Sequence, residues 1–137
     1  PHGYFLEPTV FINTNHHMRI MREEIFGPVV CIQKFATEEE AVMLANDSVY
    51  GLAGGIFTNN VTRVHRVLPQ LKCGILWVNY YHPTFNEQPW GGYKQSGIGR
   101  ELGEWGFKEY QEIKHIHVPL NNTRQSKYWY DIVVPQQ

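Results

Sequence analysis

The sequence is poor in cysteine, has no long apolar run and carries almost no net charge. Its two cysteines, Cys31 and Cys73, are too few for a disulfide-rich secreted domain, so we expect a reducing, cytoplasmic setting. No apolar stretch approaches the length that a membrane-spanning helix requires. The 12 basic and 13 acidic side chains leave a net charge of -1, so neither nucleic acid nor a membrane is an expected partner.

The order of apolar and polar residues indicates an α/β fold. A hydrophobic share of 42% and an aromatic share of 14% are typical of a chain that forms a core. A threonine followed by three glutamates is a capping box, and an asparagine precedes an apolar stripe at helical spacing, so helices are expected to begin at Thr37 and Asn60. Runs rich in β-branched and aromatic residues predict strands at 29–35, 53–58 and 74–79. This alternation predicts a βαβαβ unit with a mainly parallel sheet.

The C-terminal part of the chain is organised differently. Prolines and a glycine pair break any regular element between residues 80 and 99, and the aromatic content of this long loop argues for a function rather than for disorder. A short helix is expected at 100–110. A strand is expected at 111–118, because polar and apolar residues alternate there. Residues 121–137 are expected to form an arm that either packs on a partner or frays.

Three segments carry a resemblance to a known family. They are 23–29 (EEIFGPV), 50–55 (YGLAGG) and 89–97 (PWGGYKQSG). Together, and in this order, they resemble the C-terminal part of the aldehyde dehydrogenase superfamily, over residues 3–118. His82-Pro83, followed by Pro89-Trp90, is most similar to the betaine-aldehyde group. The chain begins with Pro1 rather than methionine, and we expect it to be a piece of a longer polypeptide.

The resemblance implies a division of labour between this chain and a missing part. Enzymes of the family oxidise aldehydes with NAD or NADP, through a cysteine thiolate that attacks the carbonyl and a glutamate that activates water. The sequence contexts of that cysteine and that glutamate do not occur here, so this chain is expected to be inactive alone. On this interpretation residues 1–109 are the end of the catalytic domain, 110–120 an oligomerisation strand and 121–137 an arm.

Two other classes of function stay open at this point. As an autonomous product, the chain would be a non-catalytic oligomerisation or interaction module that keeps the strand and lacks the chemistry. A weaker alternative is a small nucleotide-binding α/β domain. The expected partners of the parent enzyme are a small aldehyde, betaine aldehyde or an amino-aldehyde, and further copies of itself in a homodimer or homotetramer.

The resemblance assigns Glu24 and Phe26 to the cofactor. The matching glutamate of the family accepts hydrogen bonds from the nicotinamide ribose, since a carboxylate suits a diol that donates twice, and the matching phenylalanine packs beside it. From the residues alone, these two would be a solvated acid and a core aromatic before a strand.

The resemblance assigns Trp90 and Thr84 to the aldehyde tunnel. In the betaine-aldehyde group the matching aromatic ring helps to surround a quaternary ammonium, which has no hydrogen to donate and is held by aromatic faces. Taken without the resemblance, a tryptophan beside two glycines is a packing residue.

Three charged residues receive roles of a different kind. The resemblance makes Glu101 a proton relay behind the active site, whereas its position alone suits the first turn of a helix. Arg100 and Glu112 are expected at or near a subunit interface, with solvated charges on a sheet edge as the alternative.

The cysteines and histidines are not assigned to chemistry. Cys31 and Cys73 lie in or beside apolar strands, where a thiol is inert, so neither is expected to be the nucleophile. His115 and His117 share one face of the predicted strand, but no further ligand accompanies them, and no metal site is expected.

Overall fold

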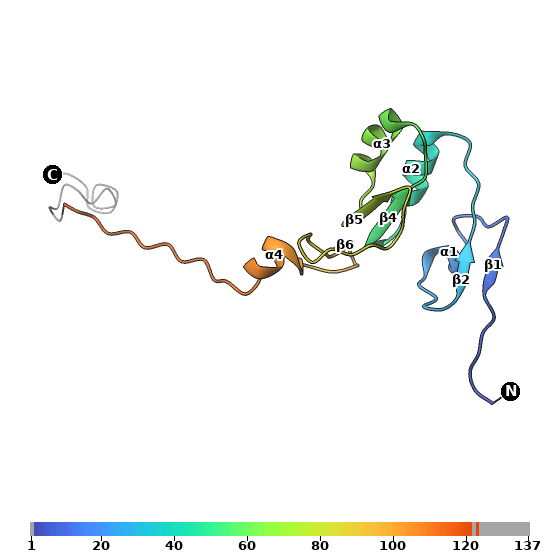
Figure 1. The fold of residues 1–137 in the computed structure, drawn as a ribbon, viewed down its shortest axis with the longest axis horizontal. Coiled ribbons are helices and arrows are strands. Elements are labelled where there is room, and N and C mark those ends of the chain that lie inside the picture. Colours follow the sequence, from blue (N-terminus) through green and yellow to red (C-terminus); the bar gives the residue numbers. More distant parts are fainter. Residues whose placement is uncertain (1, 122, 124–137) are drawn as a thin grey trace, which may run out of the picture.

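The computed structural model describes residues 2–121 and residue 123. Figure 1 shows the N-terminal strands, a central unit of two helices and a strand pair, and a C-terminal segment that leads away from both. In chain order the elements are β1 (Thr9–Phe11), α1 (Arg19–Arg22), β2 (Val29–Cys31), α2 (Glu38–Asn46), β3 (Tyr50–Gly51), β4 (Ala53–Ile56), α3 (Val61–Val67), the 3-10 helix η1 (Leu68–Gln70), β5 (Ile75–Val78), β6 (Tyr93–Lys94) and α4 (Gly103–Lys108).

Both predicted helix starts are confirmed by the capping contacts. The Thr37 hydroxyl accepts a hydrogen bond from the Glu40 amide at 3.1 Å, and the Asn60 side chain accepts one from the Arg63 amide at 3.0 Å. Each contact satisfies an amide that has no partner inside its helix. The three glutamates in the first turn of α2 also suit the positive end of the helix dipole.

The sheet confirms the α/β class but differs in its strand order. β4 pairs with β5 in parallel, joined through α3, as predicted for one βαβ unit. β2, however, pairs in parallel with β1, a strand that was not predicted, and not with β4. β3 pairs antiparallel with β6, which lies inside the region expected to be an irregular loop. The predicted single sheet is therefore divided into three two-stranded sheets among the described residues.

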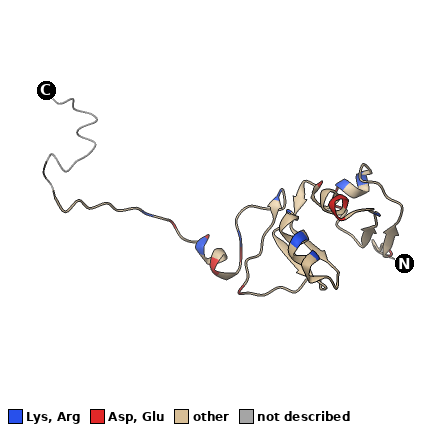
Figure 2. Ribbon diagram, turned by 90° about the horizontal axis from the view of Figure 1, so that it is seen from above, with Lys and Arg blue, Asp and Glu red and all other residues tan. Residues whose placement is uncertain are grey.

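The core lies between the helices and the central strand pair. Val67 of α3 and Trp77 of β5 are its two buried apolar residues among those described. Glu38 at the start of α2 holds α3 through Arg66, at 2.6 Å, and Arg63, at 3.1 Å. Figure 2 shows that acidic and basic residues are otherwise interspersed along the chain, without a region of one sign.

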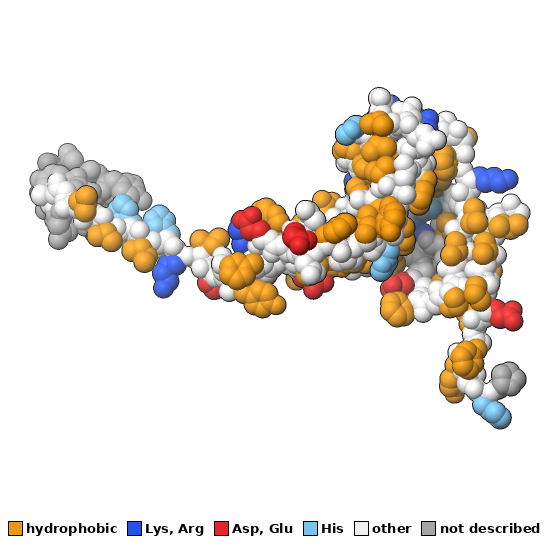
Figure 3. Space-filling model, in the orientation of Figure 1, with side chains coloured by type: hydrophobic (Ala, Val, Ile, Leu, Met, Phe, Trp, Pro, Cys, Tyr) orange, Lys and Arg blue, Asp and Glu red, His pale blue; other side chains and the backbone are white. Residues whose placement is uncertain are grey.

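Many apolar side chains remain at the surface. Hydrophobic groups form broad patches on the face shown in Figure 3, over the central unit and over the N-terminal strands. A hollow of about 530 Å³ opens between α2, α3 and β4, and apolar residues such as Val42 and Leu71 line it. A monomer that exposes this much apolar surface generally has a partner for it.

Residues 111–121 make no strand pairing with the rest of the described structure. Residues 111–119 have no regular secondary structure and run away from α4 (Figure 1). The strand predicted at 111–118 requires another chain to pair with, and stays a prediction. Of the expected arm at 121–137, only residues 121 and 123 lie within the described structure. No helix among the described residues is long and apolar enough to cross a membrane.

Candidate functional site

The segment after α1 presents Glu24 and Phe26 to solvent. Helix α1 ends where Glu23 takes an extended backbone conformation, and Glu24 follows it with an exposed side chain. Among the described residues, the Glu24 carboxylate has neither a hydrogen bond nor an ion pair. Phe26 is 93% exposed and has a backbone φ of 52°, in the left-handed region that bulky residues rarely adopt. An unpaired carboxylate therefore lies close to an exposed aromatic ring, and the backbone of that aromatic residue has a sparsely populated conformation. Such backbone conformations occur most often at functional sites.

Trp90 belongs to a cluster of aromatic rings. Its ring lies 6.4 Å from that of Trp77, which makes an edge contact with Tyr81 at 5.0 Å. The buried Trp77 also donates a hydrogen bond from Nε1 to the Pro83 carbonyl at 3.2 Å, which ties the loop to β5. Thr84 follows Pro83 on this loop, and its side chain is exposed. Trp77 and Tyr81 were not singled out in the sequence, although Trp77 lies in a predicted strand directly before the loop.

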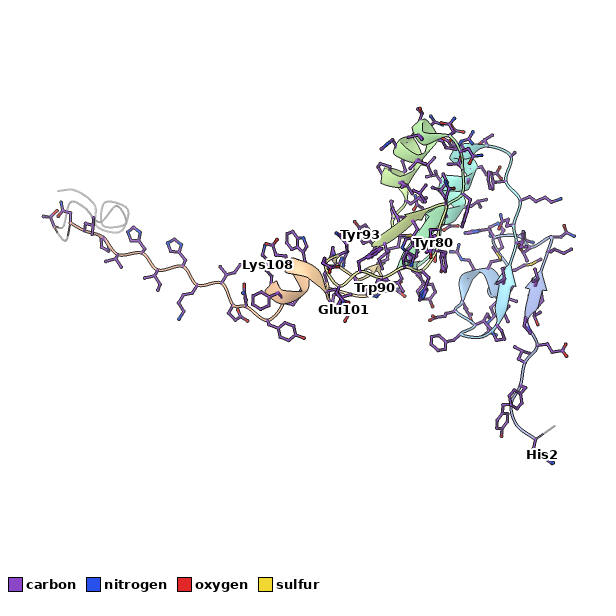
Figure 4. The ribbon with its side chains drawn as sticks, viewed as in Figure 1. His2, Tyr80, Trp90, Tyr93, Glu101 and Lys108 are labelled. Carbon is purple, nitrogen blue, oxygen red and sulfur yellow. The ribbon has the colours of Figure 1, made fainter. Side chains whose placement is uncertain are left out.

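Glu101 lies beside Trp90 through the backbone. The Trp90 amide donates to the Glu101 carbonyl at 2.7 Å, and the Glu101 amide donates to the Trp90 carbonyl at 2.9 Å. Figure 4 shows the two residues together, with Tyr93, in the segment between the central strands and α4. The Glu101 side chain is exposed, and the residue precedes α4 rather than lying in its first turn.

The Arg100 side chain binds backbone carbonyls of the loop that precedes it. Its Nη1 donates to the carbonyls of Gly99, at 2.6 Å, and Gly92, at 3.1 Å, and its guanidinium lies 5.3 Å from the centre of the Tyr93 ring. Glu112, the other residue predicted at an interface, is exposed on the extended C-terminal segment. Among the described residues, the structure does not bring these two charges together.

Three hollows lie between the cofactor candidates and Trp90, and Thr84 is not among the residues that line them. One of about 350 Å³ is lined by Glu24 and Phe26, and one of about 490 Å³ by Glu24, Leu52 and Ser96. The third, of about 320 Å³, is lined by Leu52, Ser96 and Trp90. Neighbouring hollows share lining residues, so the three follow one another along the surface from Phe26 to Trp90. We call this surface the Phe26–Trp90 channel.

Cys31 is among the residues that line the hollow beside Phe26, whereas Cys73 lines none of the three hollows. Burial raises the pKa of the Cys73 thiol above its ordinary value, and the nearby Lys94 offsets only part of that rise. The Cys31 thiol, at the edge of the hollow beside Phe26, lies 3.7 Å from the Ile20 carbonyl. A thiol whose pKa is raised is a thiolate less often at neutral pH.

Histidine, cysteine and acidic side chains do not gather into a metal-binding group. The rings of His115 and His117 lie 6.5 Å apart on the exposed C-terminal segment. Across the part of the chain that the structure describes, no three such residues come close enough to hold an ion.

Comparison with known proteins identifies the class. A sequence profile of the Aldehyde dehydrogenase family matches residues 1–116, and the chain belongs to this family. It is 51% identical to the betaine aldehyde dehydrogenase of Bacillus subtilis, over 84% of this chain and 24% of the relative. It is also 51% identical to a peroxisomal aminoaldehyde dehydrogenase of Pisum sativum, over 83% of this chain and 23% of the relative.

The solved structures agree with the curated relatives. The crystal structure of the betaine aldehyde dehydrogenase of Staphylococcus aureus in complex with NAD+ superposes with a TM-score of 0.76 at 57% identity, and the match covers 77% of this chain and 21% of that one. An apo structure of the same enzyme, a variant, gives a TM-score of 0.80 over 82% of this chain. The chain spans about a quarter of the length of the relatives it matches.

Proposed function

We propose that this chain is the C-terminal quarter of an NAD(P)-dependent aldehyde dehydrogenase that converts an aldehyde into a carboxylic acid. Family membership and the Phe26–Trp90 channel support this function. On this proposal residues 1–109 complete the catalytic domain, 110–120 pair with another subunit and 121–137 follow as an arm. The nucleophilic cysteine and the basic glutamate belong to a preceding part of the polypeptide, so the isolated chain has no activity.

The residues at one end of the channel fit the nicotinamide ribose of the cofactor. The ribose hydroxyls donate hydrogen bonds, and the exposed Glu24 carboxylate, without a partner among the described residues, can accept them. Phe26 offers an uncovered ring for the apolar side of the same group. The bound NAD or NADP supplies the hydride acceptor, and these two residues orient it.

The residues at the other end fit a cationic aldehyde. Trp90, held against Trp77, presents an aromatic face, which attracts a quaternary ammonium electrostatically without a hydrogen bond. This supports betaine aldehyde or an amino-aldehyde as the substrate, with Thr84 on the wall of the tunnel. The observation that carries the proposal is that Glu24 and Phe26 on one side, and Trp90 on the other, line neighbouring hollows that share lining residues.

Glu101 and the interface residues have roles that depend on the rest of the enzyme. We propose that Glu101 relays protons once neighbouring polypeptide buries its side chain, since burial favours the protonated form of a carboxyl group. Arg100 contributes to the interface by fixing the loop carbonyls beside Tyr93. Glu112 contributes from the segment that pairs with the other subunit.

The decisive experiment joins this chain to the preceding part of a related complete enzyme. Residues 1–118 replace the matching segment of the Staphylococcus aureus enzyme, and the resulting chimera is tested for NADH formation with betaine aldehyde. We expect turnover by the chimera and none by the isolated chain; turnover by the isolated chain, or an inactive but folded chimera, would contradict the proposal. In the chimera, Trp90→Ala should reduce kcat/KM for betaine aldehyde about fivefold more than for an uncharged aliphatic aldehyde.

One observation also favours a non-catalytic assembly role for the isolated chain. Ile113 is 100% exposed and Ile116 is 74% exposed on an extended segment that has no strand partner among the described residues. Such an edge pairs readily with another strand. Sedimentation of the isolated chain distinguishes the alternatives, because an assembly module forms dimers that Ile113→Lys dissociates.

A further inference from the structure

One acidic residue at the end of α2 is bound by two basic side chains from the segment around α1. The Arg22 Nη1 lies 2.8 Å from the Asp47 backbone carbonyl and 2.9 Å from its carboxylate. The His16 Nε2 lies 2.7 Å from the same carbonyl and 2.8 Å from the same carboxylate. Both the backbone carbonyl and the carboxylate of Asp47 therefore contact Arg22 and His16, which precede it by 25 and 31 residues. We call this set the Asp47 cluster.

The Asp47 cluster contacts the segment before α1 and the last residue of α1. His16 precedes the helix and Arg22 is its last residue. A helix of four residues has little stability of its own, so its position is set by contacts with its surroundings. The Arg22 and His16 side chains are 38% and 14% exposed, whereas the Asp47 side chain that they share is 55% exposed, so the cluster is only partly shielded from water.

The same turn also receives the loop that carries Trp90. The Lys94 Nζ donates to the backbone carbonyls of Asn46, at 2.8 Å, and Ser48, at 2.9 Å. The Gln95 amide donates to the Val49 carbonyl at 2.9 Å. The turn at 46–49 therefore contacts α1, which precedes Glu24, through Arg22. Through Lys94 it also contacts the loop that carries Trp90.

We infer that the Asp47 cluster is a positioning element that fixes Glu24 for the nicotinamide ribose. Glu24 follows Arg22 by two residues and has no side-chain partner of its own among the described residues, so its place depends on where α1 ends. A shift of about 1 Å in a group that orients a ligand has a large effect on its interaction. The inference rests on the function proposed above and assigns Arg22, Asp47 and His16 to it as residues that act through Glu24.

Another charged cluster provides a contrast. Glu38, Arg63 and Arg66 form an equally close set, but they join α2 to α3 beside the large apolar hollow and do not touch α1. Loss of those contacts affects the stability of the central unit without a selective effect on the cofactor. The Asp47 cluster differs because one of its members lies two residues from the proposed ribose ligand.

The test compares two ligands on the chimera defined above. Adenosine diphosphate contains the adenine half of NAD+ but not the nicotinamide ribose, so it reports on the intact fold and on the phosphate site. In Arg22→Met, we expect the calorimetric Kd for NAD+ to rise about tenfold and the Kd for adenosine diphosphate to stay unchanged. Asp47→Asn should give the same selective change with a smaller magnitude, because the backbone carbonyl still accepts.

Two matched variants complete the experiment. Arg19→Met removes the other arginine of α1, which pairs only with the neighbouring Glu23, and should leave both Kd values unchanged. Arg22→Lys keeps a donor for Asp47 and should recover most of the NAD+ affinity. In steady-state assays Arg22→Met should raise the KM for NAD+ and leave the KM for betaine aldehyde unchanged.

The outcomes separate this inference from the function on which it rests. An unsubstituted chimera that folds but does not bind NAD+ would refute the proposed function. A chimera that binds NAD+ with the same Kd after Arg22→Met would refute the positioning role alone. Equal weakening of both ligands, or the same loss in Arg19→Met, would also refute it, because the effect would then be general to the fold or to α1.

Discussion

The central unit and the C-terminal segment use their apolar residues in opposite ways. In the unit from Thr37 to Asn79, both main helices are capped, two strands pair in parallel and Trp77 is buried. In the segment at 111–118, the apolar side chains are exposed and the backbone has no strand partner among the described residues. The comparison teaches that contacts within the chain specify the first region, and that among the described residues no such contacts specify the second.

The largest expected effect is at the buried ring of the central unit. Trp77→Ala removes a ring that contacts Tyr81, packs near Trp90 and bonds to the loop, and should lower the free energy of unfolding by about 3 kcal/mol. Denaturant titration of the isolated chain measures this. Trp105→Ala on α4, where the ring is 58% exposed, is the matched control and should cost less than about 0.5 kcal/mol. An equal loss of unfolding free energy in the two variants would contradict the distinction between buried and exposed apolar residues.

Hydrogen exchange should separate the two regions next. The amides of Ile75 and Asn79 donate to the carbonyls of Leu52, at 3.0 Å, and Ile56, at 2.8 Å, and should exchange about a hundredfold more slowly than an unstructured peptide in the isolated chain. Residues 112–118 should exchange at the unstructured rate. In the chimera, the same residues should become protected if they pair with another subunit. Protection of 112–118 in the isolated monomer would contradict the comparison.

A smaller effect is expected at the helix caps. Asn60→Ala removes the acceptor for the Arg63 amide and should lower the free energy of unfolding by about 1 kcal/mol. Asn59→Ala changes the neighbouring exposed residue and is expected to be neutral within about 0.5 kcal/mol. Thermal or denaturant unfolding of the two variants measures the difference directly. An equal loss of unfolding free energy in both would show that the cap does not stabilise the helix.

The smallest effect should appear as a pH dependence. Hydrogen bonds from Arg66 and, to a lesser degree, the charges of Arg66 and Arg63 hold the pKa of Glu38 below its ordinary value. Because the folded state has the lower pKa, the pair stabilises the fold above the ordinary glutamate pKa of about 4.3. That contribution is lost as the pH falls through the folded-state pKa. The unfolding free energies of the native chain and Glu38→Gln should therefore differ at pH 6 and converge near pH 2; a constant difference would exclude the linkage.

The elements that could be predicted from the sequence are those specified locally. The caps at Thr37 and Asn60 depend on an amide three residues away, and the β4–α3–β5 unit follows from short apolar runs around one helix. The strand β1 was missed because it has three residues and forms only by pairing with β2, about twenty residues along the chain. Short strands of this kind are specified by their partner rather than by their own sequence.

The candidate site shows the same limit. Glu24, Phe26 and Trp90 could be named from motifs that resemble a family, and the structure places them along one surface. The contacts of Asp47 with His16 could not be predicted, because 31 residues separate them and neither residue type is unusual in its position. Local patterns therefore indicate candidate site residues, whereas only the fold reveals the contacts that position the elements carrying them.

Two backbone hydrogen bonds join Trp90 to Glu101, so residues 91–100 form a loop that is closed at its base. Within this segment Ile98 is 100% exposed and lies between Gly97 and Gly99, whose φ angles are positive. Exposed tips of this kind tolerate altered length and composition. A different side chain at Ile98 would therefore change the lining of the hollow beside Trp90 without removing the two hydrogen bonds that hold Trp90 next to Glu101.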